Sequence, residues 1–314
     1  MHISTILSAL SSKKGYIYCI LSGIFWGTAG CCGQFLFDSR GWSVDFMIPV
    51  RISVAGIAVL LIAYCTEGPD TIKRTLQGRR NLLELISFGV LGIGLCQYSY
   101  YVTISESNAA TATILCYLSP IFIIFWMALR TRHLPVYTEV ISVVLAMTGT
   151  FFLATHGDIT TLVMSEKALL WGIISAISTA VYTIQPKRLT AEYGTLSTTG
   201  LGMMIGAVFL LIVRQPWMHV EGVFDLTAWA AFAVVTLVGS AFSFTLFFCG
   251  MRYIGPTKAS ILCATEPLSS TILSVFWLQV VFVPMDFLGF LLIFSTIFIL
   301  AIPVKRLTSA SSEH

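Results

Sequence analysis

Ten stretches of mostly apolar residues, separated by short polar connections, constrain this chain more than any other feature of its sequence. A helix needs about 17–25 such residues to cross the roughly 30 Å hydrocarbon core of a bilayer. The stretches that qualify are residues 16–37, 43–65, 82–102, 108–129, 135–154, 168–187, 197–213, 228–249, 258–282 and 286–304. The sequence therefore predicts an all-α integral membrane protein with ten transmembrane helices.

The composition also favours a membrane protein. Apolar residues make up 56% of the chain and charged residues 11%, compared with about 25% charged residues in soluble domains. So few charges cannot cover a soluble surface. The net charge of +3 is small and its cations are dispersed, which argues against a nucleic-acid partner.

The positions of lysine and arginine predict how the helices are oriented, because these residues collect in short cytoplasmic connections. With a cytoplasmic N-terminus, 14 of the 18 cations fall on the cytoplasmic side. They are Lys13, Lys14, Lys73, Arg74, Arg79, Arg80, Arg130, Arg132, Lys187, Arg188, Arg252, Lys258, Lys305 and Arg306. We therefore expect a multi-pass plasma-membrane protein with cytoplasmic tails at 1–15 and 305–314. The first stretch is too long for a signal peptide and is expected to be an uncleaved helix.

Two matching segments 147 residues apart predict an internal repeat. They are TILCYLSPI at 113–121 and SILCATEPL at 260–268, and each has a proline where a membrane helix would be midway through its span. Halves of five spans each, at 16–154 and 168–304, must enter the membrane from opposite sides. The predicted fold is thus two inverted five-helix repeats, an arrangement that usually has its substrate site near the midplane between the halves.

Further short motifs carry a family resemblance. They are GIFWG at 23–27 in the first span, PKRL at 186–189 at the end of the sixth, and the paired SP and EP segments. With the ten-span organisation, they resemble the drug/metabolite transporter superfamily, in its EamA-type branch, over about residues 16–304. The resemblance implies two EamA-like repeats and a central cavity lined mainly by the first, third, fourth, sixth, eighth and ninth helices. Family members often carry an acidic-basic pair after the fourth and ninth spans. Here those regions read RTRHLP and LQVVFVP, so no role is carried over for that pair.

Polar side chains inside the apolar stretches are the candidates for lining such a cavity. In the sixth span, polar and aromatic residues from Trp171 to Gln185 recur every three or four positions and so share one helical face. The predicted substrate-binding residues are Trp26, Gln97, Tyr101, Tyr117, Ser119, Ser178, Tyr182, Glu266 and Ser270. Interhelical hydrogen bonds, core packing and an interfacial tyrosine girdle are the alternative roles.

Glu266 is the main departure from symmetry between the two matching segments. A charged side chain at the bilayer centre costs about 2.5–3.5 kcal/mol on insertion scales, so it should be neutralised, paired or exposed to a wet cavity. Ser270, one turn later, and Ser119, in the matching segment, could hydrogen-bond it. We expect Glu266 to be the polar centre of the site, binding substrate or carrying a proton. A purely structural hydrogen bond across helices is the alternative.

Three other features are expected to be mainly structural. Arg51 should pair with Asp45 or extend toward the interface, with a substrate role as the alternative. Tyr100 is expected in an interfacial girdle. Gly23 and Gly27 are expected to allow close helix packing, with a hinge for alternating access as the alternative.

Three classes of function remain after these considerations. An intramembrane enzyme is disfavoured because HExxH, GxSxG and metal-ligand spacings are absent from the sequence. A channel is disfavoured because there is no ring of charges or filter-like sequence. We favour a secondary transporter of small polar metabolites, amino acids and related compounds above all, working by alternating access. No cofactor or metal is expected. The partners are a small-molecule substrate and the lipid bilayer, with a coupling proton and a homodimer left open.

Overall fold

The computed structural model is helical throughout the residues that it describes, which are 2–106, 109–132, 135–155, 157–158, 160, 165–278 and 283–302. The first half of the chain forms α1 (His2–Asp38), α2 (Val44–Thr66), α3 (Pro69–Leu76), α4 (Arg79–Ile86), the π-helix η1 (Ser87–Gly94), α5 (Leu95–Glu106), α6 (Ala109–Cys116), α7 (Ser119–Thr131) and α8 (Tyr137–Thr155). Helices α1, α2 and α8 follow the first, second and fifth predicted spans, and the third and fourth are divided into shorter segments.

The second half repeats this order. It forms α9 (Glu166–Ile184), α10 (Lys187–Tyr193), α11 (Thr195–Arg214), the 3-10 turn η3 (Pro216–Met218), α12 (Leu226–Ala233), the π-helix η4 (Val234–Phe242), α13 (Ser243–Ile254), α14 (Pro256–Leu262), α15 (Thr265–Leu278) and α16 (Pro284–Ala301). Most of each predicted span thus falls on helical structure, and residues 108, 279–282 and 303–304 of these spans lie outside the described residues.

Six helical segments in the described part of the chain are long and apolar enough to cross a membrane. They are Lys13–Asp38, Val44–Thr66, Arg79–Glu106, Glu166–Tyr193, Thr195–Arg214 and Leu226–Ile254. Ser119–Thr131, Tyr137–Phe152 and Pro284–Ile299 are shorter apolar helices. The chain is therefore an all-helical, multi-pass membrane protein, and the six long segments coincide with the first, second, third, sixth, seventh and eighth predicted spans.

The two halves pack against each other in corresponding ways. Helix α1 packs against α13, and α9, at the matching place in the second half, packs against α5. Helix α2 packs against α11, and α8 packs against α16. The π-helices η1 and η4 also correspond, because Ser87 and Val234, at which they begin, are 147 residues apart. The spacing of the matching sequence segments thus recurs in the helices.

The fourth and ninth predicted spans are each interrupted by a short turn. Residues 117–118 separate α6 from α7, and residues 263–264 separate α14 from α15. Pro120 and Pro267 then lie in the first turn of a new helix, where a missing backbone N–H leaves no hydrogen bond unmade. The prolines that the sequence put in mid-span therefore mark places where the helix restarts.

Helix α1 lies directly against the start of α15 because Gly23 and Gly27 have no side chains. A Cβ atom at Gly23 would lie 2.1 Å from the Thr265 Oγ1, and one at Gly27 would lie 2.4 Å from the backbone oxygen of Glu266. Close packing is therefore one role of these glycines, as expected. The contact brings the backbone of Glu266 to the middle of the molecule.

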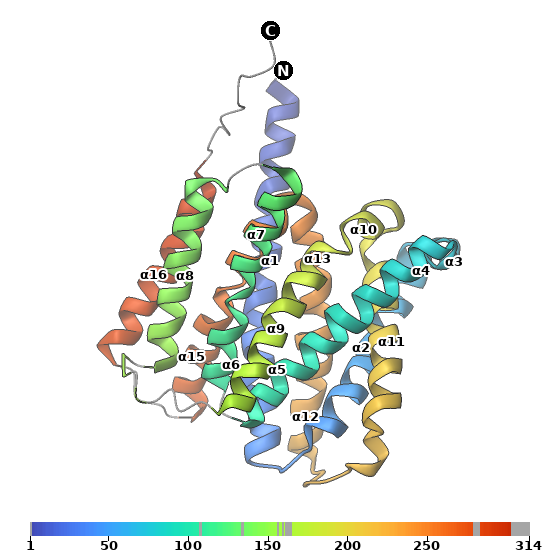
Figure 1. The fold of residues 1–314 in the computed structure, drawn as a ribbon, viewed down its shortest axis with the longest axis vertical. Coiled ribbons are helices and arrows are strands. Elements are labelled where there is room, and N and C mark those ends of the chain that lie inside the picture. Colours follow the sequence, from blue (N-terminus) through green and yellow to red (C-terminus); the bar gives the residue numbers. More distant parts are fainter. Residues whose placement is uncertain are drawn as a thin grey trace.

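The connections between helices gather at the two ends of the molecule. Figure 1 shows the start of α1 at the same end as α3 and α10, and the connections from α1 to α2 and from α11 to α12 at the opposite end. We call these the α3 end and the α12 end.

Candidate functional site

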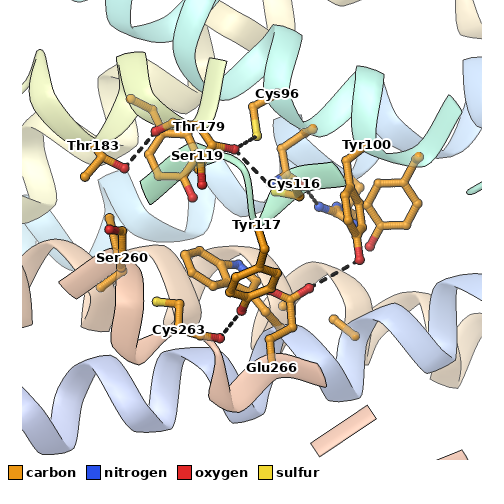
Figure 2. Close-up of a pocket in the computed structure, with 18 residues that line it drawn as sticks. Cys96, Tyr100, Cys116, Tyr117, Ser119, Thr179, Thr183, Ser260, Cys263 and Glu266 are labelled. Carbon is orange, nitrogen blue, oxygen red and sulfur yellow. Dashed lines mark hydrogen bonds between the residues drawn. The ribbon is translucent and has the colours of Figure 1, made fainter. Parts of the chain in front are cut away.

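A cavity lies at the centre of the molecule, beside the two helix interruptions. Its walls come from α1, α2, α5, the α6–α7 turn, α9, η4, α13 and the α14–α15 segment. Figure 2 shows the side chains around it, with Tyr117 and Cys263 from the two interruptions close together. The Tyr117 hydroxyl donates a hydrogen bond to the Cys263 carbonyl, which joins one interruption to the other. Every helix that the family resemblance implied contributes, and α2 contributes in addition.

Seven of the nine predicted site residues line this cavity: Trp26, Gln97, Tyr101, Tyr117, Ser119, Tyr182 and Glu266. The other two do not. Ser178 is 2% exposed and away from the cavity, where α9 presents Thr179, Tyr182 and Thr183 instead. Ser270 donates to the carbonyl oxygen of Pro267 at 3.0 Å. At the centre of the sixth span, Thr179 therefore lines the cavity in place of the predicted Ser178.

Glu266 receives a hydrogen bond from Tyr100, which was expected in an interfacial girdle. The Tyr100 hydroxyl donates to Glu266 Oε1 at 3.2 Å (Figure 2) and lies 3.1 Å from the Thr113 hydroxyl. Among the described residues, neither Ser119 nor Ser270 hydrogen-bonds this carboxylate. The expectation for these serines was therefore wrong, and Tyr100 lies in the cavity wall instead of an interfacial girdle. Its corresponding residue in the second half, Phe247, lines the same cavity.

Arg51 also lines the cavity, and its expected pairing was wrong. The side chain is 1% exposed, donates through Nη2 to Gln97 Oε1, and lies over the Tyr101 ring at 4.6 Å from the ring centroid. Asp45 instead accepts from the Tyr98 hydroxyl and lies 3.6 Å from Arg214. Residues six apart point about 120° apart around a helix, so the spacing itself could have excluded the pair.

Two donor atoms of Arg51 have no partner. Its Nε and Nη1 are buried without a hydrogen bond to any described residue. A buried guanidinium is costly unless an anion or several acceptors satisfy it. Since Arg51 is at the cavity wall, these donors are suited to an anionic group in the cavity.

The cavity therefore combines a cation and an acid with aromatic walls. Arg51 comes from α2 and Glu266 from α15, so opposite halves of the chain supply them. The Phe247 ring lies 5.4 Å from the Trp26 ring and 5.8 Å from the Tyr182 ring, centroid to centroid. Within the described residues no group of three or more histidine, cysteine and acidic side chains is placed to hold a metal ion. The chemistry available is recognition of a small polar molecule.

Comparison with known proteins decides the family. The profile of the EamA-like transporter family matches this chain twice, over residues 13–155 and 166–302. The chain belongs to the EamA-like transporter family. It is thus a membrane transporter, not an enzyme, and the resemblance to the drug/metabolite transporter superfamily is confirmed.

Similar proteins match the EamA-like chain over most of its length. The "Uncharacterized inner membrane transporter YicL" of Salmonella typhimurium is 36% identical over 304 residues, which cover 96% of this chain and 99% of that protein. The "Uncharacterized transporter YwfM" of Bacillus subtilis is 22% identical, with 96% and 99% covered. A solved structure described as "Crystal structure of protein" has a TM-score of 0.75 at 16% identity, covering 92% of this chain and 96% of that one. That structure shares the fold.

Polar contacts join the two halves of this EamA-like transporter at the α12 end. Arg214 lies 3.6 Å from Asp45, and Arg40 lies 3.1 Å from Asp225. Lys167 also pairs with Glu106. A hollow at this end is lined by the residues of the Arg214–Asp45 and Lys167–Glu106 pairs and by Tyr98 and Trp171.

Contacts of a similar kind join the halves at the α3 end. Arg188 donates through Nε to Glu84 at 3.0 Å and through Nη2 to Asn81 at 2.6 Å. The Glu67 carboxylate accepts from the backbone N–H groups of Leu196 and Ser197, which begin α11. The central cavity therefore lies between two sets of contacts that bridge the halves.

Proposed function

We propose that this protein is a secondary transporter for small zwitterionic metabolites, such as amino acids and related compounds, which bind in the central cavity. The observation that carries the proposal is the presence of Arg51 and Glu266 in the wall of one buried cavity. A zwitterion with a carboxylate and an ammonium group complements both side chains. A neutral or singly charged solute would leave one or both of them without an oppositely charged group.

Each part of such a solute has a matching group. The unpartnered Nε and Nη1 of Arg51 suit a carboxylate, since a guanidinium can donate two parallel hydrogen bonds to one. The Glu266 carboxylate suits an ammonium group. The rings of Trp26, Tyr101 and Tyr182 offer a surface for an apolar or aromatic side chain.

We further propose that transport proceeds by alternating access in ten membrane helices arranged as two inverted five-helix repeats, 16–154 and 168–304. The corresponding packing of α1 with α13 and of α9 with α5 supports the repeat. The bridging contacts at the α3 and α12 ends support a cycle in which one set opens while the other stays closed. Glu266 could couple the cycle to a proton.

The proposed location is the plasma membrane, with both termini in the cytoplasm. The Salmonella relative is named an inner membrane transporter, which supports the location. Most lysine and arginine residues of the connections belong to the α3 end, where α1 begins (Figure 1). The positive-inside rule then makes the α3 end cytoplasmic.

Thermal stability of the purified protein against matched compounds tests the substrate class. The compounds are compared in sets of four: an amino acid, its amide, its N-acetyl derivative and the corresponding amine. A ligand at about 100 times its dissociation constant stabilises the folded state by about 2.7 kcal/mol. We expect the zwitterion to stabilise the protein more than the other three compounds do. Ser270→Ala, outside the cavity, should respond like the wild type. Equal stabilisation by the amine or the N-acetyl compound would contradict the proposal.

A further inference from the structure

A second hollow, separate from the central cavity, opens between α7, α9 and α10 and is here called the lateral groove. Its lining residues include Phe125, Trp126 and Arg130 of α7, Ile177 of α9 and Lys187 of α10. Phe125 is 68% exposed and Trp126 is 48% exposed, so their rings form an open surface. In a membrane protein, such a surface on the outside of the helices faces acyl chains.

The cations of the lateral groove lie at one end of this apolar wall. Arg130 is in the last turn of α7, and Lys187 is the first residue of α10. Figure 1 shows α7 and α10 reaching toward the α3 end of the molecule. The groove is thus apolar along its length and positively charged where its helices approach the membrane surface.

The other two cations of the groove, Arg80 and Arg188, are paired with carboxylates in or beside it. The Glu84 carboxylate lies 3.0 Å from Arg80 Nε and 3.0 Å from Arg188 Nε. Arg188 also pairs with Glu192 at 2.7 Å. These two cations are therefore matched by two carboxylates. Arg130 and Lys187 have no ion-pair partner among the described residues, which leaves the groove with an excess of two positive charges.

We propose that the lateral groove is a binding site for an anionic phospholipid. Its phosphate would lie between Arg130 and Lys187, and its acyl chains would lie along Phe125, Trp126 and Ile177. Charge complementarity selects an anionic lipid, since basic pockets between membrane helices bind acidic headgroups. The site is independent of the transported substrate. Because α7 belongs to the first half and α9 to the second, the lipid would contact both halves.

Native mass spectrometry of the intact protein tests this site. Protein in detergent is offered equal amounts of phosphatidylglycerol and phosphatidylcholine with the same acyl chains. We expect the wild type to retain phosphatidylglycerol preferentially. The double variant Arg130→Gln/Lys187→Gln should lose about 30-fold in phosphatidylglycerol binding, from about 1 kcal/mol for each of the two cations, and keep its weak phosphatidylcholine binding.

A matched variant separates the groove from general attraction to a basic surface. Lys73→Gln/Arg79→Gln removes two exposed cations from the same end but outside the groove, and should bind phosphatidylglycerol like the wild type. An equal loss in both variants, or in neither, would overturn the proposal. Competition by glycerol 3-phosphate as strong as that by the intact lipid would also overturn it, because the site would then take a soluble phosphate.

Fluorescence quenching gives a second readout that does not depend on removing the cations. Trp126 lines the groove, so the quenching lost on Trp126→Phe substitution reports a lipid at this place. In bilayers containing a small fraction of brominated lipid, brominated phosphatidylglycerol should quench the Trp126 component more strongly than brominated phosphatidylcholine. Equal quenching by the two lipids would mean that ordinary bilayer lipid occupies the groove without selection, which would overturn the proposal.

Discussion

The Tyr100 hydroxyl donates a hydrogen bond to Glu266 Oε1 at 3.2 Å, joining α5 of the first half to α15 of the second. The bond crosses the centre of the molecule beside the cavity (Figure 2). Any movement of one half against the other must change it. It also gives the carboxylate a protein partner that a substrate ammonium group would have to share or displace.

Glu266→Gln should remove the pH dependence of transport, because glutamine keeps the shape of the side chain but cannot exchange a proton. The measurement is uptake of an identified zwitterion into proteoliposomes between about pH 5.5 and 8. Tyr100→Phe is the matched control: it removes the hydrogen bond and keeps the carboxylate, so pH dependence should persist. A Glu266→Gln variant that folds and transports with unchanged rate and pH profile would leave the carboxylate with a structural role.

Arg51→Gln should weaken binding of compounds that carry a carboxylate. Hydrogen bonds to charged groups contribute about 1.5–3 kcal/mol, which corresponds to a rise of about 10- to 100-fold in the dissociation constant. Isothermal titration of the amino acid and of its amide checks this. The amide is the internal control, since its affinity should change little. If the two compounds lost affinity equally, Arg51 would act through folding of the site and not by contacting the carboxylate.

Gly27→Ala should destabilise the protein by about 1–3 kcal/mol, the usual cost of overpacking. The new Cβ would lie 2.0 Å from Ser269 Oγ and 2.4 Å from the backbone oxygen of Glu266, and the latter contact cannot be relieved by a side-chain rotation. Gly30→Ala, one turn later on α1, is the control, since no atom lies within 4 Å of its Cβ position. Thermal unfolding in detergent compares the two. Similar melting temperatures would show that α1 and α15 separate easily.

Asp45→Asn should favour opening of the α12 end. Asp45 bridges to Arg214 at 3.6 Å and accepts from Tyr98 at 2.8 Å. Partly exposed ion pairs contribute about 0.2–1 kcal/mol, so the open population should rise by up to about fivefold. The readout is the rate at which a small methanethiosulfonate reagent modifies Cys263 in the cavity wall.

That rate is measured in a background without the other native cysteines, and Asp38→Asn serves as its control. Asp38 is at the same end, but its hydrogen bond from Gln34 stays within α1, so this variant should leave the rate unchanged. An unchanged rate in Asp45→Asn as well would mean that this contact does not hold the halves together.

Residues 79 and 219 should be accessible from opposite sides of the membrane. Arg79 begins α4 near the α3 end, and His219 lies between α11 and α12 at the α12 end. Single cysteines at these positions, in a protein without native cysteines, are labelled with an impermeant maleimide in intact cells. We expect labelling at 219 and protection at 79. The reverse pattern would invert the proposed orientation.

Hydropathy and the repeat were sufficient to predict the helical segments and part of the cavity wall. Trp26, Gln97 and Glu266 could be predicted because a polar or amphipathic side chain in an apolar stretch is costly unless it has a polar partner or faces a cavity. The spacing of Arg51 and Asp45 could have excluded their pairing, whereas Tyr100 was misassigned because a one-dimensional pattern does not say which helix lies opposite. The Tyr100 hydroxyl reaches Glu266, 166 residues later, and that partner is set by packing.

The sequence also did not determine which residues of α9 face the cavity. Ser178 and Thr179 are neighbours that point about 100° apart, and both are small and polar. The choice of Thr179 for the cavity depends on α9 packing against α5 and η1, and not on its own residues. Ser178 was predicted because it lies four residues before Tyr182 and so on the same side of the helix. Thr179, three residues before Tyr182, fits this criterion equally well.

The orientation of α5 in the cavity wall depends on the number of residues in the π-helix η1. A π-helical turn holds more residues than an α-helical turn, so each additional residue offsets the helix that follows by about 100°. Helix α5 begins directly after η1 and presents Gln97, Tyr100 and Tyr101 to the cavity. The direction in which these three side chains point relative to α4 therefore depends on how many residues lie between Ser87 and Gly94 and on whether they form π-helical or α-helical turns. Along this segment, the number of residues is as much a determinant of specificity as their identity.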